Sequence, residues 1–193
     1  MSYVYRRLAL EHYGRYWKVT PRLRTLDAGP TRDLPPWFAV AEFHTGDIWR
    51  YATVGMSAGA HGGVETYLIS PDQNDRAVEI LFSLTRFHLT GKSVGLAHTV
   101  NFGMPLWGGS QLDHGYLSYP YLENEGFLYI DRGGARSTGI LWLIPITREE
   151  REFKRQRGAN ALESLFEEHQ LDCADPFRRS VLPPPPPILG FSA

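Results

Sequence analysis

The longest apolar stretch of the sequence, Ile140 to Ile146, limits what this chain can fold into more than any other feature. Strands with one face in water alternate apolar and polar residues, but the apolar residues here follow one another without alternation. We therefore predict a fully buried strand from Thr138 to Ile146. The stretch contains Pro145 and falls far short of the roughly 18 consecutive apolar residues that indicate a membrane span.

Shorter runs rich in β-branched and aromatic residues predict further strands. Thr45-Gly46-Asp47 is typical of the tight turn of a β-hairpin. The region from Leu96 to Gly115 is dense in His, Asn, Gly, Trp and Pro, and we predict short strands joined by a structured loop there. The other predicted strands are Trp37–His44, Ile48–Met56, Val64–Ile69, Tyr116–Tyr121 and Phe127–Asp131.

Two helices are predicted in the first half of the chain. Apolar residues at helical spacing from Tyr3 to Tyr16 indicate an amphipathic N-terminal helix. Ser70-Pro71-Asp72-Gln73 is typical of a helix start, because serine caps, proline suits the first helical position and glutamine stands at capping-box spacing. Gly91 is placed to end this second helix in the left-handed conformation.

Two more helices are predicted near the end of the chain. Thr147 and Glu150 form a capping box for the first of them, and Gly158 ends it. Asn160 is predicted to cap the second, which runs to about Gln170.

The order helix, strands, helix, strands, two helices predicts an α+β fold, with a mixed or antiparallel sheet and flanking helices. The 193 residues suffice for one ordinary domain. We assign residues 1–36 to an N-terminal helix and connector, residues 37–182 to the main domain and residues 183–193 to a proline-rich C-terminal tail. Pro183 to Pro187 favour polyproline II, which suits either a frayed end or a ligand for an aromatic groove.

Charge and cysteine content restrict the function classes. The formal net charge is -1, which argues against a nucleic-acid partner, since such domains carry a basic excess. Cys173 is the single cysteine, so no disulfide forms within the chain and a reducing compartment fits best. It stands among acidic residues, which makes it a poor nucleophile. Met1 to Arg7 lacks the apolar region of a secretory signal, and we expect a cytoplasmic protein without a membrane partner.

An enzyme remains the alternative because of one serine motif. Gly55-Met-Ser57-Ala-Gly59 matches the G-x-S-x-G pattern of serine hydrolases, and Ser57 with His98 or His114 and an aspartate would form a triad. That motif needs a helix directly after the serine, whereas glycines follow here. A simple passage from strand to loop is the competing explanation.

A metal site is the second alternative. His98, Asp113 and His114 lie in one glycine-rich region and offer the imidazole and carboxylate ligands that Zn²⁺ takes. Their spacing matches no short metal motif, and a structural polar network that includes His98 and Asn101 is the competing explanation. Gly134 to Gly139 lacks the lysine of a phosphate loop and is predicted to be a hairpin turn. We expect no cofactor.

Several segments together resemble a known family. They are Thr53–Ser57, Glu65–Pro71, Gly95–Gly103, Asp113–Gly115, Leu141–Thr147, Glu150–Lys154 and Asp175–Pro176. Their order and spacing resemble the Suppressor of fused domain family in its compact bacterial form, from about Trp37 to Val181. The resemblance implies an α+β domain without known enzymatic activity. The best-known animal member restrains a transcription factor with the help of a second domain, for which this chain is too short, and bacterial members look like immunity proteins.

We therefore predict a non-enzymatic protein-binding domain, of the immunity type that neutralises a toxin by direct binding. The alternatives are a hydrolase that uses His98, His114 and Ser57, metal- or serine-dependent, and a regulatory scaffold without a toxin partner. The sequence does not determine the oligomeric state. Aromatic residues anchor interfaces but also pack readily inside sheets. The predicted partner contacts are Trp107, Asp113, His114, Tyr116 and Tyr119.

Overall fold

The computed structural model describes residues 3–26, 30–58, 63–133 and 137–183, and it confirms the α+β class. One mixed sheet has the strand order β1-β2-β3-β4-β8-β6-β5, with β7 paired to β8 outside this path. All neighbouring strands are antiparallel except β4 and β8. The strands are β1 Arg22–Arg24, β2 Ala39–Thr45, β3 Ile48–Val54, β4 Val64–Ser70, β5 Thr99–Asn101, β6 His114–Ser118, β7 Tyr129–Asp131 and β8 Ser137–Ile146. The helices are α1 Tyr3–Trp17, α2 Asp75–Thr90, α3 Arg148–Arg157 and α4 Ala159–Glu168, with short 3-10 helices η1 Pro30–Asp33, η2 Met56–Ala58 and η3 Glu125–Phe127.

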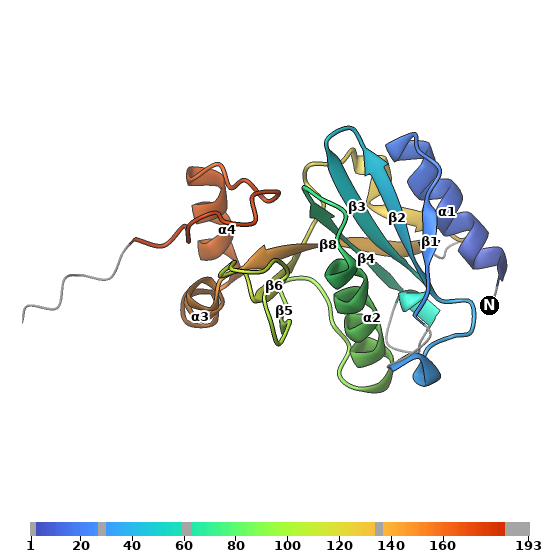
Figure 1. Ribbon diagram of the computed structural model, residues 1–193, viewed down its shortest axis with the longest axis horizontal. Coiled ribbons are helices and arrows are strands. Elements are labelled where there is room, and N and C mark those ends of the chain that lie inside the picture. Colours follow the sequence, from blue (N-terminus) through green and yellow to red (C-terminus); the bar gives the residue numbers. More distant parts are fainter. Residues whose placement is uncertain (1–2, 27–29, 59–62, 134–136, 184–193) are drawn as a thin grey trace, which may run out of the picture.

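The central strand β8 is the buried strand that the sequence predicts. It lies between β4 and β6, and Figure 1 shows it running from the body of the sheet to α3 and α4. All of its residues from Ile140 onward are buried. Trp142 and Ile144 face one half of the core, whereas Leu141 and Leu143 face the other. The apolar residues do not alternate because both faces of β8 are covered.

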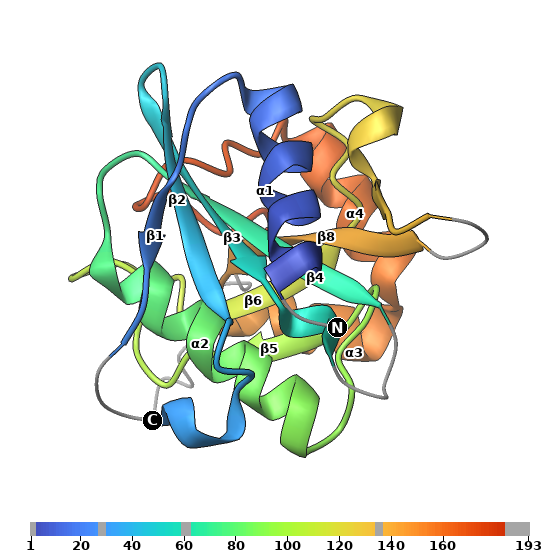
Figure 2. The same cartoon turned by 90° about the vertical axis from the view of Figure 1, so that its right-hand side faces the viewer.

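Helices cover the two faces of the sheet separately. Tyr13 and Trp17 of α1 pack with Phe43 and Tyr67 on one face, where α4 also contributes Phe166. The apolar side of α2 packs on the other face, and Figure 2 shows α1 and α2 on opposite sides of the sheet. The molecule therefore has three layers, with the sheet in the middle.

The hairpin between β2 and β3 forms as predicted. Thr45 pairs with Ile48, so Gly46 and Asp47 alone make the turn. Gly46 has a φ of 67°, the left-handed conformation that such a turn requires and that glycine adopts without strain.

The predicted start of the second helix is wrong. Ser70 is the last residue of β4, paired with Trp49, so it cannot cap a helix. The helix α2 begins at Asp75, and the Asn74 side chain caps it by accepting a hydrogen bond from Arg76 N–H. Gly91 does donate to Phe87 at the other end, but its φ of -119° is not the predicted left-handed conformation.

The capping box of α3 is confirmed, whereas the predicted cap of α4 is wrong. Thr147 accepts from Glu150 N–H, and the Glu150 carboxylate accepts from Thr147 N–H. Gly158 ends α3 with a φ of 92° and directly precedes α4, which starts at Ala159 without a side-chain cap. Asn160 is therefore inside the helix, because a single glycine makes the corner between the two helices.

Two predicted strands are displaced along the chain. β6 begins at His114 and ends at Ser118 rather than covering 116–121, and β7 begins at Tyr129 because Phe127 belongs to η3. The predicted turn at Gly134 and the proline tail after Pro183 lie outside the described residues, as does Gly59 of the serine motif. Within the described ranges, no helix has the length and apolarity that crossing a membrane requires.

Gly115 of β6 is a position where the packing leaves no room for a side chain. A Cβ added there would lie 2.5 Å from Leu143 Cδ1 and 2.8 Å from the Phe102 ring. We expect Gly115→Ala to lower the free energy of unfolding by about 1–3 kcal/mol through overpacking, measured by urea unfolding. Gly108→Ala is the control, because nothing lies within 4 Å of its added Cβ. Equal stability of the two variants would contradict this packing.

Candidate functional site

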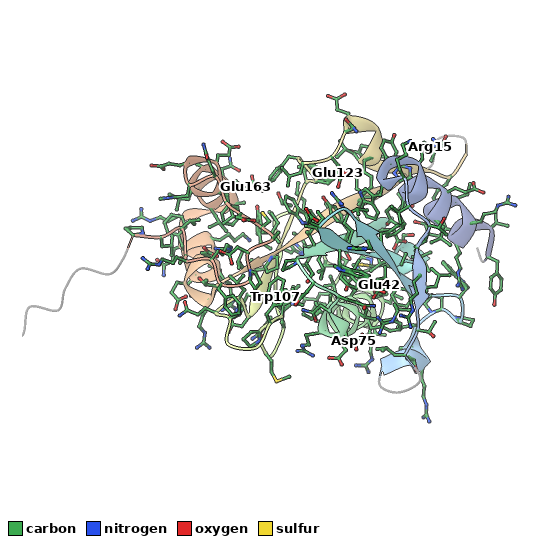
Figure 3. All side chains as sticks on the ribbon, turned by 45° about the horizontal axis from the view of Figure 1, so that its top comes forward. Arg15, Glu42, Asp75, Trp107, Glu123 and Glu163 are labelled. Atoms are coloured by element: carbon green, nitrogen blue, oxygen red, sulfur yellow. The ribbon has the colours of Figure 1, made fainter. Side chains whose placement is uncertain are left out.

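The predicted partner contacts divide into buried and exposed side chains. Trp107 and Tyr116 are buried, and each is held by a carboxylate: Trp107 N–H donates to Asp72, and the Tyr116 hydroxyl donates to Glu163 of α4. Figure 3 labels Trp107 and Glu163. Their side chains therefore offer almost no surface to a partner in this conformation. Tyr119 is 51% exposed and stays a predicted contact.

Asp113, the last residue before β6, pairs with His114, the first residue of β6. His114 Nδ1 lies 2.6 Å from Asp113 Oδ1, and the histidine is buried while the aspartate is partly exposed. His98 does not join them, because its exposed ring accepts a hydrogen bond from Gly95 N–H. In the part of the chain that the structure describes, no three His, Cys, Asp or Glu side chains gather as metal ligands would.

His98 and Asn101 each hold their own loop. Asn101 Oδ1 accepts from Gly103 N–H at 2.7 Å, and His98 accepts from Gly95. Both are side-chain to backbone contacts within a few residues, so the predicted polar network is here a pair of separate local contacts.

Ser57 lies in η2, where its hydroxyl faces a carboxylate rather than a histidine. It donates to Glu65 Oε1 at 2.8 Å and is buried. A hydrolytic serine needs a neighbouring base that takes its proton and an open approach for substrate. The geometry of Ser57 therefore does not favour the predicted triad with His98 or His114.

The Glu65 carboxylate is a buried centre that sequence reasoning missed. Burial raises its pKa, and the hydrogen bonds that it accepts oppose that shift. These bonds tie β4 to α1, to β3 and to the segment after β3. The donors are the hydroxyls of Tyr5, Thr53 and Ser57 and the backbone N–H groups of Gly55, Met56 and Ser57, at 2.6–3.2 Å.

A second buried centre joins Glu150 of α3 to Arg178. The guanidinium donates to both carboxylate oxygens at 2.8 and 2.9 Å, and also to Pro145 O at the end of β8. Val181 N–H donates to the same carboxylate. The capping box predicted one role of Glu150, but no sequence signal linked it to an arginine 28 residues later.

Cys173 is a poor nucleophile mainly because it is buried, and the neighbouring acidic residues that the sequence shows contribute less. Burial raises the pKa of its thiol to about 12, with Asp172 and Glu150 adding to the shift and Arg178 opposing it. The thiol is therefore protonated at neutral pH.

A groove lies between α2 and β5. Its volume is about 360 Å³, and apolar side chains predominate in it. Phe87 of α2 is 51% exposed at this groove. The lining residues are Arg76, Ile80, Ser83, Leu84 and Phe87 of α2 and Thr99, Val100, Asn101 and Phe102 of β5 and its end.

The strand that borders this groove is the edge of the sheet. Phe102 N–H donates to Asp113 O, and Leu117 N–H donates to His98 O, so the residues on either side of β5 bond toward β6. Residues of an antiparallel pair alternate in this respect. The backbone N–H and C=O groups of Thr99 and Asn101 therefore point away from β6, toward the open edge.

Comparison with known proteins gives the chain clear relatives. Residues 37–179 match the model of the family described as Suppressor of fused protein (SUFU). The structure is similar to that of a SUFU homolog from Neisseria gonorrhoeae, with 27% identity and a TM-score of 0.84, over 94% of this chain and 98% of that one. It shares the fold of a chain in the Sufu-Fu complex, with 12% identity and a TM-score of 0.67 over 92% of each. No curated protein matches the sequence.

Proposed function

The chain belongs to the Suppressor of fused family, and from that premise we propose that it is a non-enzymatic domain that binds another protein. The Sufu-Fu complex, whose fold this chain shares, is by its name an assembly of one protein with another. The observation that carries the proposal is the α2–β5 groove, because it combines an apolar floor with an open strand edge.

The groove suits an extended segment of the partner that adds to the sheet beside β5. In this mode the backbone of the bound segment pairs with the edge strand, while alternate side chains enter pockets. Thr99 and Asn101 supply the outward backbone groups. Val100 packs into the core on the α2 side, so alternate side chains of an added strand would meet Ile80 and Phe87.

We propose further that the partner is a toxin that this chain neutralises in the cytoplasm by direct binding. Two observations support this proposal: the match to the Suppressor of fused family and the mainly apolar lining of the α2–β5 groove. The test is co-expression: a toxin partner should arrest growth alone and permit growth together with the wild-type chain. A captured partner that is harmless when expressed alone would contradict the immunity role and favour a regulatory scaffold.

We expect Phe87→Ala to weaken partner binding by about 2 kcal/mol, or roughly 30-fold in Kd, since exposed aromatics in grooves act as interface anchors. The tagged wild-type chain first captures the partner from source-cell lysate, and mass spectrometry identifies it. Isothermal titration then compares the variants with the purified partner. Thr99→Pro tests the strand edge, because it removes an outward N–H and leaves the bonds to β6 in place.

Matched variants locate the binding surface. Val4→Ala removes a side chain that is 62% exposed on α1, on the opposite face of the sheet, and should leave Kd unchanged. Tyr119→Ala tests the remaining contact predicted from sequence. Wild-type affinity of Phe87→Ala together with weak binding of Tyr119→Ala would move the site from the groove to the loop after β6.

A further inference from the structure

Two of the buried donors that have no hydrogen-bond partner among the described residues lie on neighbouring strands of the core. They are the Tyr67 hydroxyl on β4 and the Trp142 indole N–H on β8. Both side chains are fully buried. Tyr67 and Trp142 are register partners in the parallel pair, and their rings stack with centroids 6.0 Å apart. The two donors therefore belong to one region of the core.

An ion pair borders this region. Arg50 of β3 pairs with Ile69, two residues from Tyr67, so the side chains of Arg50 and Tyr67 leave the same face of the sheet. Arg50 Nε is also buried without a hydrogen-bond partner among the described residues, and it lies 3.5 Å from Glu123 Oε1. Arg50 and Glu123 both act electrostatically on the Tyr67 hydroxyl. Figure 3 labels Glu123.

These groups define the ligand that the site would take. Burial raises the pKa of Tyr67 far above neutral, so its hydroxyl is protonated and can donate. A donating hydroxyl and an indole N–H together call for an acceptor. The adjacent ion pair is neutral overall and favours neither an anion nor a cation. Both rings are fully buried, and Tyr121 packs edge-on against Trp142 with ring centroids 5.4 Å apart, which excludes a large ligand.

We propose that Tyr67 and Trp142 bind an internal water molecule, which accepts hydrogen bonds from both side chains and donates to the Glu123 carboxylate. Buried polar groups in native proteins are almost always satisfied, and internal water that makes about three hydrogen bonds is a common means. This water links the sheet to the loop that carries Glu123. Trp17 N–H, which donates to Glu123 Oε1 at 3.1 Å, holds the same loop from α1.

The variant Tyr67→Phe tests the proposal by the sign of its effect on stability. If the hydroxyl donates to water, its removal loses a hydrogen bond and the urea midpoint falls by roughly 0.5 M. If the hydroxyl is unsatisfied, its removal relieves desolvation and the midpoint rises. Tyr13→Phe is the matched control, because that buried hydroxyl donates to Thr53 O at 3.1 Å. A Tyr67→Phe midpoint at or above wild type overturns the proposal.

Direct observation completes the test. A high-resolution crystal structure of the wild-type chain should show one water within hydrogen-bond distance of Tyr67 Oη and Trp142 Nε1. By NMR, the Trp142 indole proton should show cross-relaxation with long-lived water, and this signal should weaken in Tyr67→Phe. An anion at the position, located by bromide soaking, or a direct protein acceptor for either group would overturn the assignment.

Discussion

Replacing Arg178 by methionine is expected to lower the free energy of unfolding by about 3–5 kcal/mol, because the Glu150 carboxylate then stays buried without its cation. The two side chains are 6% and 0% exposed, so water cannot replace the lost partner. The guanidinium contacts both carboxylate oxygens, a two-pronged geometry that strengthens arginine–carboxylate pairs. Urea unfolding at neutral pH measures the difference.

A matched surface variant shows how much of the stability loss is due to the burial of the Glu150–Arg178 pair and how much to the loss of any arginine. Arg155 pairs with Glu152 on the exposed side of α3, and its side chain is 60% exposed. We expect Arg155→Met to change stability by less than about 1 kcal/mol. Similar losses in Arg178→Met and Arg155→Met would contradict a special role of the buried pair.

The pair also predicts how stability changes in acid. Burial alone would raise the pKa of Glu150, but Arg178 and the backbone N–H groups of Thr147 and Val181 outweigh it, and the folded pKa lies below the ordinary value of 4.5. The ionised carboxylate therefore stabilises the fold above pH 4.5, and this contribution is lost as the pH falls through the lower folded pKa. Arg178→Met should lose less stability than the wild type over that range.

Replacing Glu65 by glutamine is expected to cost about 3 kcal/mol, although the side chain keeps its size. Every group around Glu65 donates, and a glutamine NH₂ also donates. One of its two positions would face Met56 N–H or Ser57 N–H, which cannot turn to accept. Buried donors left without acceptors lower stability.

The consequence of Glu65→Gln should extend beyond global stability. Glu65 joins Tyr5 of α1 to the segment after β3, so the variant should expose backbone amides of residues 55–57 to faster hydrogen exchange. Glu79→Gln on α2 is the control, because that carboxylate is 52% exposed in an i,i+3 pair with Arg76. Unchanged stability and exchange in Glu65→Gln would show that the carboxylate does not organise this segment.

Sequence patterns correctly predicted the elements that are stabilised by interactions between residues close together in the chain. The Gly46-Asp47 turn and the Thr147–Glu150 box form because a few consecutive residues contain all the groups that make them. The start of α2 was predicted wrongly because Ser70 had two possible roles. A helix cap and a strand end compete for the same residue, and pairing with Trp49 across the sheet decided between them.

The same division holds for the candidate site. The sequence indicated short strands joined by a structured loop in the region from Leu96 to Gly115, and β5 with Asn101 lies there. It could not show that Phe87, at an exposed position of α2, would border this strand and form a groove with it. Residues far apart in the chain meet only when the sheet is assembled.

The sequence by itself determined the α+β class and the buried central strand, because hydrophobic pattern and local capping are encoded within short windows. Only the tertiary structure decided which polar residues become buried centres. Glu65 and Glu150 look like ordinary surface carboxylates in the sequence. Their roles come from Tyr5 and Arg178, which are 60 and 28 residues away and are brought into contact only by packing of the whole chain.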